Sequence, residues 1–233
     1  MGDDGYREWS SRYGGATVWT KTVAPGAIGS PVLPDGCIDL IWADGTLLVA
    51  GPDTKAHHPS ASGRDYVGFR FFPGTAPTLL GVPAHELRDR RVDLADLWDT
   101  ATTRRLTARV DDALDRAGAL EAVVLERASG VGPVDPLVRG VVGALDSGRS
   151  VTEVAEMLSV DARTLHRKSL AAFGYGPKTL ARILRVRRAI AAARGGLSFA
   201  DTAATTGFAD QAHLARDVRE FAGTTLRQLL SRP

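Results

Sequence analysis

Basic side chains gather in one part of this 233-residue sequence, between residues 161 and 194. Nine lysines and arginines lie there, and Asp161 is the only acidic residue among them. The two parts of the chain differ in the same sense, because residues 1–133 hold 14 basic and 18 acidic residues whereas residues 134–233 hold 15 and 9. Such a run is typical either of a solvated helix face or of a surface that binds phosphate groups.

Side chains suited to contact nucleic-acid bases form two clusters in this basic part of the chain. The first cluster holds Arg163, His166 and Arg167, and the second holds Gln211, Ala212, His213 and Arg216. Arginine carries a fork of donors that matches guanine O6 and N7, glutamine suits adenine, and a small alanine fits against a thymine methyl group. We therefore hypothesise that both clusters read bases, the alternative for each residue being a merely solvated side chain.

Four further cations lie where they would contact the phosphate backbone of a duplex. They are Lys168, Lys178, Arg182 and Arg185. Contacts of this kind supply affinity without sequence information.

An internal repeat predicts the elements that position these side chains. The segment that begins at Ser150 recurs 48 residues later at Ser198. Each copy opens with a hydroxyl residue that can cap a short helix. Each copy then has an alanine (Ala155 or Ala203) where two helices can cross closely.

A tight turn and a second helix complete each copy of the repeat. Val160 and Phe208 are the apolar residues that fill the angle between the two helices, and Leu165 and Leu214 anchor the second helix. This is the construction of a helix-turn-helix unit, whose second helix enters the major groove. A chance pair of helical hairpins is the weaker interpretation, because two copies are joined by a basic segment.

The motifs of this region resemble the DNA-binding domain of AraC/XylS-type transcription activators. They are Phe173-Gly-Tyr-Gly-Pro177, the connector 180–188, the core 206–216 and the closing Phe221-Ala-Gly-Thr-Thr225, within residues 135–230. The resemblance implies two helix-turn-helix units (150–173 and 198–221) joined by a helix near 177–194, so that one chain spans two successive major grooves. It also implies double-stranded DNA, RNA polymerase and a second copy of the chain as partners.

Two positions depart from the family pattern. The family usually has a bulky apolar residue where Ser169 stands and a proline where Leu226 stands. We expect Ser169 to loosen the packing of the first unit and Leu226 to alter only the start of the last helix.

The first part of the chain follows a different pattern. Short segments rich in β-branched and aromatic residues (15–23, 37–43, 46–50 and 66–72) are separated by turn signals and predict a small barrel or sandwich. From about residue 75 the spacing becomes helical, near 75–81, 84–98, 102–117 and 119–128. We expect these helices to join the two domains or to support a dimer contact.

The expected fold is therefore α+β with two domains. Residues 1–130 form a β-rich domain with a helical linker, and residues 134–233 form an all-α double helix-turn-helix domain. By resemblance, the first domain is cupin-like or a small barrel and binds a small effector or mediates dimerisation.

Aromatic residues of the expected strands are candidates for an effector pocket. Trp19, Trp42, Phe69 and Phe71 would provide its apolar walls, and Arg70 would provide a polar contact. Aromatic side chains at strand spacing also form ordinary hydrophobic cores, which is the competing interpretation.

Metal, redox and catalytic chemistry find little support in the residue pattern. His57 and His58 are adjacent and cannot easily face one metal, and Cys37 and Asp39 are distant in sequence. We expect Cys37, the single cysteine, to be a buried and inert thiol. No nucleophile with a neighbouring base and no phosphate-binding glycine loop occurs, so we expect neither a cofactor nor an enzyme.

No apolar run approaches the length of a membrane span, and the N-terminus is polar and acidic. With one cysteine and no intramolecular disulfide, a cytoplasmic location is expected. The favoured function is a sequence-specific transcription regulator that responds to a small molecule. The alternative is a small-molecule-binding protein or an enzyme whose helical end is incidental.

Overall fold

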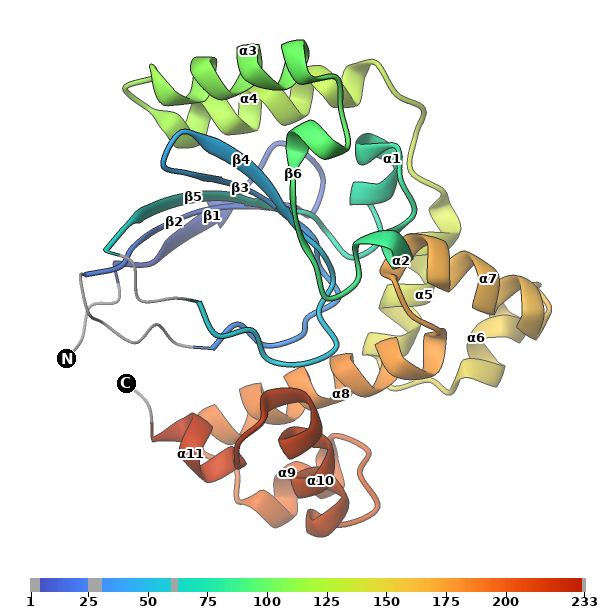
Figure 1. Ribbon diagram of the computed structural model, residues 1–233. Helices are drawn as coiled ribbons and strands as arrows, with labels where there is room; N and C mark the ends of the chain where they lie inside the picture. The colour runs from blue at the N-terminus through green and yellow to red at the C-terminus, as the bar shows by residue number, and fades with distance from the viewer. Residues whose placement is uncertain (1–4, 25–30, 60–62, 232–233) are drawn as a thin grey trace.

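The computed structural model describes residues 5–24, 31–59 and 63–231. Its strands are β1 (Arg7–Ser10), β2 (Thr17–Thr22), β3 (Asp39–Ala43), β4 (Thr46–Ala50), β5 (Asp65–Arg70) and β6 (Arg91–Asp93). They form one antiparallel six-stranded sheet in the order β1-β2-β5-β3-β4-β6, with β1 and β6 at its edges (Figure 1).

Side chains alternate between the two faces of this sheet, as the pleat of a strand requires. On β5, Val67 and Phe69 point to one face, where both are buried in a hydrophobic core. Gly68 and Arg70 point to the other face, where Arg70 lines a pocket. The alternation separates a core face from a pocket face.

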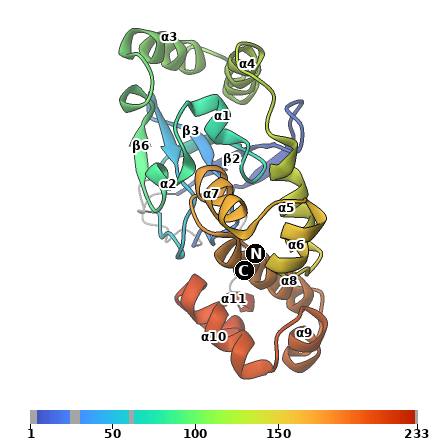
Figure 2. The same ribbon diagram turned by 90° about the vertical axis from the view of Figure 1, so that its right-hand side faces the viewer.

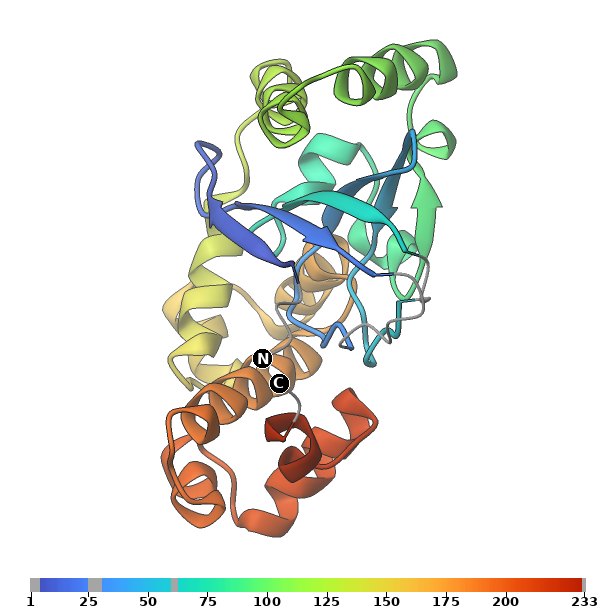
Figure 3. The same cartoon turned by 90° about the vertical axis from the view of Figure 1, so that its left-hand side faces the viewer.

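Two helices lie between β5 and β6 in the sequence, and all the other helices follow β6. The helices are α1 (Ala76–Leu80), α2 (Ala84–Leu87), the 3-10 turn η1 (Leu94–Asp96), α3 (Thr100–Asp111), α4 (Arg116–Ser129), α5 (Pro136–Asp146), α6 (Val151–Met157), α7 (Ala162–Phe173), α8 (Pro177–Arg194), α9 (Phe199–Thr205), α10 (Gln211–Ala222) and α11 (Leu226–Leu230). In Figure 3, α3 and α4 (green) lie above the sheet, and α8–α11 (orange to red) lie below it.

Two hydrophobic cores hold these elements together. The first joins the sheet to α1–α4 through residues such as Phe69, Leu79 and Leu120. The second joins α5–α11 around α8 and includes Leu165, Leu184 and Val218. The strand-rich first part and the all-helical second part are therefore confirmed.

One local expectation is wrong. A helix was expected over 84–98, but residues 91–93 form edge strand β6, where Val92 pairs with Val49 and is buried in the core. The helices expected near 102–117 and 119–128 are α3 and α4, which pack on the core face of the sheet.

The two parts of the chain also contact each other. Helix α2 packs against α7, beside which it lies in Figure 2. The Arg88 guanidinium donates to the Gly174 carbonyl oxygen over 3.3 Å, and Arg139 donates to that of Gly14 over 2.7 Å. These contacts connect the sheet domain to α5 and α7 of the C-terminal part.

No helix in the described ranges has the length and apolar character of a membrane span.

Candidate functional site

The first helix-turn-helix unit consists of α6 and α7. Ser150 caps α6 in a capping box with Glu153, and Asp161 caps α7 by accepting from Thr164 N over 2.8 Å. Leu165 is completely buried beneath α7. The base-reading candidates Arg163, His166 and Arg167 are exposed on the opposite side of α7, and the His166 ring lies against Gly176 in the following turn.

The second unit repeats this plan with α9 and α10. Ser198 caps α9, and Asp210 caps α10 by accepting from His213 N over 2.6 Å. The turn residue between the helices has a left-handed backbone in both units, at Ser159 (φ 52°) and Gly207 (φ 82°). Gln211, Ala212 and Arg216 are exposed on α10.

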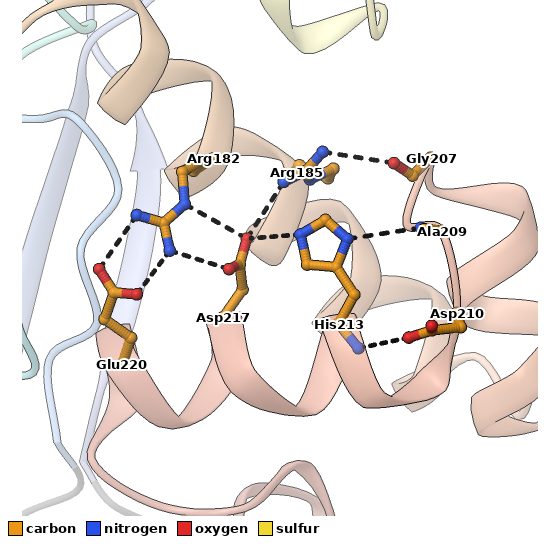
Figure 4. A network of polar contacts seen from close by, with 8 residues as sticks. All are labelled: Arg182, Arg185, Gly207, Ala209, Asp210, His213, Asp217 and Glu220. Atoms are coloured by element: carbon orange, nitrogen blue, oxygen red, sulfur yellow. Dashed lines mark hydrogen bonds and ion pairs between the residues drawn. The ribbon is translucent and has the colours of Figure 1, made fainter.

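A network of ion pairs fixes α10 to the central helix α8 (Figure 4). Asp217 is almost fully buried and accepts from Arg182 over 2.8 Å and from Arg185 over 3.1 Å. Arg182 also binds Glu220 over 2.6 Å, and its guanidinium lies 4.9 Å from the centre of the Phe221 ring. The pKa of Asp217 is lowered, because the two arginines outweigh the burial that would raise it.

This network changes the interpretation of several predicted contacts. Arg182 and Arg185 were predicted to bind phosphates, but their guanidinium groups bind carboxylates of α10. His213 was predicted to read bases, but its ring packs edge-on against Phe208 at 5.2 Å and its Nε2 lies 3.8 Å from Asp217. These three side chains hold the unit together in this structure.

The remaining phosphate candidates differ from each other. Lys168 forms an ion pair of 2.7 Å with Asp135, the cap of α5, although both side chains are well exposed. Lys178 is exposed at the start of α8, and no ion pair to it occurs in the described part of the chain. Of the four predicted phosphate-binding residues, Lys178 is therefore the one whose charge is not engaged by a carboxylate among the described residues.

Two further residues share the exposed face of α10 and were missed. Ala215 and Arg219 are exposed and follow Ala212 at three- and seven-residue steps. Helical spacing from Ala212 is the signal that could have found them.

Residues 145–232 match the family model of a helix-turn-helix domain. The C-terminal part is an AraC-type helix-turn-helix domain. Residues 16–93 match a second family, described as a domain of unknown function (DUF6597).

Several solved structures are similar to parts or most of this chain. ToxT from Vibrio cholerae O395 has a TM-score of 0.50 at 9% identity, over 93% of this chain and 99% of its own. ToxT of strain SCE256 with a bound unsaturated fatty acid has 0.46 at 10% identity, over 92% and 94%. A probable AraC family regulator from Rhodopseudomonas palustris CGA009 has 0.38 at 20% identity, over 42% and 97%. A comparison with curated proteins found no match.

The sheet domain that precedes the AraC-type domain contains a pocket of about 250 Å³ on its second face. Trp19 and Arg70 line this pocket as expected, together with Tyr6, Ile41 and Leu48. Trp42, Phe69 and Phe71 do not line it, because the pleat turns them to the core face, where they are buried among apolar side chains. For these three, ordinary core packing is the correct interpretation.

Polar side chains lie at one end of the pocket. The Trp19 indole donates to Asp39 over 2.7 Å, and Arg70 Nε lies 3.3 Å from Asp39 and 3.6 Å from Asp35. Burial raises the pKa of Asp39 although Arg70 and Trp19 act in the opposite direction. Burial also raises the pKa of the Cys37 thiol, which keeps it protonated.

Two glycines allow close approaches around this pocket. Trp19 lies flat on Gly68, where a Cβ atom would be 2.0 Å from the indole. Gly51 lies against the Leu87 carbonyl group in the same way. A larger hollow of about 520 Å³ lies between η1, α3 and α4, on the side of the sheet domain away from α8 and α10.

We predict that Asp217→Asn lowers the free energy of unfolding by about 1–3 kcal/mol at pH 7, because two arginines lose their shared carboxylate. Since the folded pKa of Asp217 is below its ordinary 3.8, the difference from wild type is complete above that pH and disappears as the pH falls through the folded pKa. Urea unfolding followed by circular dichroism measures it. Glu220→Gln, at a 53% exposed side chain, is the control and should cost less than about 1 kcal/mol. Equal stabilities of wild type and Asp217→Asn at pH 7 would contradict the assignment.

Proposed function

We propose that the protein is a sequence-specific transcription regulator in which residues 134–233 bind duplex DNA and residues 1–130 bind a small-molecule effector. The observation that carries the proposal is that both second helices, α7 and α10, present exposed arginines on the side opposite their buried leucines. Both units belong to one chain and are joined by α8, which at 18 residues is about 27 Å long. A single copy can thus address an asymmetric site.

The two reading faces have different chemistry. On α7, Arg163 and Arg167 favour guanine. On α10, Gln211 favours adenine, the small Ala212 and Ala215 leave room for thymine methyl groups, and Arg216 favours guanine. Lys178 and Arg219 supply backbone contacts.

Substitution of Arg167 or Arg216 by alanine should weaken binding to the selected duplex by about 1–3 kcal/mol and relax preference at one or two base pairs. Lys178→Ala should weaken binding equally for all sequences and reduce the salt slope by about 0.9, the contribution of one phosphate. Binding-site selection from random duplexes, followed by titrations of selected and random DNA, measures both effects. Arg104→Ala, on α3 and remote from both units, is the control. If the two arginine variants lose affinity equally for selected and random duplexes, the division into reading and backbone residues is wrong.

The same segments that border the pocket also contact the DNA-binding domain. Residues 51–57 follow β4, and Gly51, Asp53 and His57 line the pocket. Pro52 packs on Gly174, the residue that ends α7, and Ala56 N donates to the Phe221 carbonyl oxygen near the end of α10 over 2.7 Å. Segment 51–57 therefore contacts the C-terminal ends of α7 and α10, the two helices proposed to read bases and called the reading helices below.

Segment 31–36 makes the corresponding contact with α8. Leu33 lines the pocket and also packs against the C-terminal core. The Asp35 carboxylate faces Arg70, while its backbone carbonyl accepts from Arg187 of α8 over 3.3 Å. Two backbone hydrogen bonds between Val32 and His57, of 2.8 and 2.9 Å, connect the two segments. We propose that they transmit pocket occupancy to the reading helices.

Coupling of this kind is reciprocal, so DNA binding should alter the pocket segments. We predict that saturating the full-length protein with a selected duplex changes hydrogen exchange at residues 51–57, above all at the Ala56 amide. Gly174→Ala should reduce this change, because its Cβ would lie 2.6 Å from Pro52 Cγ.

Gly223→Ala is the matched control for this experiment. Both glycines have a left-handed backbone at the end of a reading helix, but nothing lies within 4 Å of a Cβ at Gly223. Both variants thus carry the same backbone strain, and only Gly174→Ala displaces segment 51–57. If DNA binding slows hydrogen exchange in α7 and α10 but leaves exchange at residues 51–57 unchanged, the proposed coupling through segment 51–57 is wrong.

A further inference from the structure

The floor of the pocket has a charged row and an apolar row, set by the strand register. Arg70, Asp39, Ala50 and Arg91 are neighbours across β5, β3, β4 and β6. Trp19, Gly68, Ile41 and Leu48 are neighbours in the next row on the same face. A ligand that fills the pocket therefore meets ionic groups at one end and an apolar surface beside them.

The charged row contains an excess of carboxylate. Arg91 and Asp53 bind each other through two contacts of 2.8 and 2.7 Å, so this pair is closed. Asp39 and Asp35 instead share a single guanidinium, and both lie on the same Nε atom of Arg70 at 3.3 and 3.6 Å. Among the side chains that line this end of the pocket, two carboxylates thus face one cation, and the nearby Arg187 guanidinium of α8 lies outside the lining, 3.3 Å from the Asp35 backbone carbonyl oxygen.

The other titratable groups that line the pocket do not cancel this excess of carboxylate. Burial and the neighbouring Arg91 lower the pKa of His57, so its ring is neutral at pH 7. The Cys37 thiol is protonated. Lys21 lies two residues beyond Trp19, at the opposite end of the floor, and has a partner of its own.

The negative charge of the buried Asp39 carboxylate is also only partly stabilised by its neighbours. It is 9% exposed as a residue, and its near contacts are the Trp19 indole at 2.7 Å and one edge of Arg70. The pKa of Asp39 is raised, because burial raises it more than the contacts with Arg70 and Trp19 lower it. A cation placed beside Asp39 would restore the stabilisation that burial removes.

The apolar row suits an aromatic or aliphatic body attached to such a cation. The Trp19 ring is supported from below by Gly68, and the Tyr6 ring lies 6.1 Å from it between centroids. Aromatic faces attract organic cations as well as apolar groups. Ile41 and Leu48 continue the apolar surface.

We infer that the pocket takes a small organic amine, with its protonated nitrogen between Asp39 and Asp35 and its apolar body over Trp19, Ile41 and Leu48. This inference rests on the proposed effector-binding function and specifies its ligand class. An anionic ligand that approached Arg70 would have to lie beside both carboxylates, which disfavours it.

Three probes with one phenylbutyl body separate the charge classes: 4-phenylbutylamine, 4-phenylbutanol and 4-phenylbutyrate. Calorimetric titration of the full-length protein at pH 7 should rank the amine first, about tenfold to a hundredfold tighter than the alcohol, as expected for a hydrogen bond to a charged partner. The carboxylate should bind more weakly than the alcohol. Asp39→Asn should reduce the preference for amine over alcohol to about one.

Because Asp39 is buried, Asp35→Asn serves as a second variant at a side chain that is 23% exposed, and it should reduce the same preference. Asp44→Asn is the matched control. Asp44 lies in the β3–β4 turn outside the pocket, where it pairs with Arg64, and asparagine tolerates its left-handed backbone (φ 46°). This control should keep the wild-type preference.

Equal binding of amine and alcohol, tighter binding of the carboxylate, or no binding of any probe would overturn the amine assignment. Titrations of DNA with the same preparations keep the two proposals apart. A carboxylate that binds and changes DNA affinity overturns only the ligand class, whereas a protein that does not bind DNA overturns the proposed function whatever the pocket holds.

Discussion

The pleat of one antiparallel sheet is the constraint on which the N-terminal domain depends. Because side chains alternate, each strand contributes to two environments that cannot exchange members without a shift of register. Phe69 and Trp42 enter the core beneath α3 and α4, whereas Arg70 and Trp19 face the pocket. Helices α3 and α4 cover the core face, whereas polar groups such as Asp39 lie on the other face, beside the pocket, as the pleat places them.

The C-terminal domain depends in a similar way on α8. Apolar residues of this helix form the centre of the second core, and its arginines bind Asp217 and Glu220 of α10. Internal ion pairs thus orient the second reading helix, while exposed side chains on its far side remain available for DNA. A positively charged surface therefore contains two kinds of arginine, those that hold the fold and those that face solvent.

Much of this architecture could be predicted from residue patterns. Capping serines at 150 and 198 and the buried Leu165 and Leu214 follow from local spacing, and the structure has them in these roles. Strand β6 was missed, because three residues are too few to show a period of two. The face on which Trp19 or Trp42 lies depends on the register of whole strands, which local composition does not reveal.

Partners distant in sequence were the other limit. Arg182 and Arg185 lie in a basic segment of the kind that binds phosphates. Only the tertiary structure shows that both form ion pairs with Asp217, more than 30 residues later in the sequence. The paired carboxylates of the pocket likewise become visible only when the segment 31–36 folds over the sheet. Helix faces could be predicted from sequence, whereas ion-pair partners required the tertiary structure.

The central claim is that pocket and reading helices form one coupled system, and a closed thermodynamic cycle tests it most directly. The affinity of the full-length protein for a selected duplex is measured with and without the phenylbutyl probe that binds most tightly, and the affinity for that probe is measured with and without the duplex. Linkage requires both ratios to be equal. The account predicts that they are equal and differ from one. A ratio of one in both directions, with probe and duplex bound together, would contradict it.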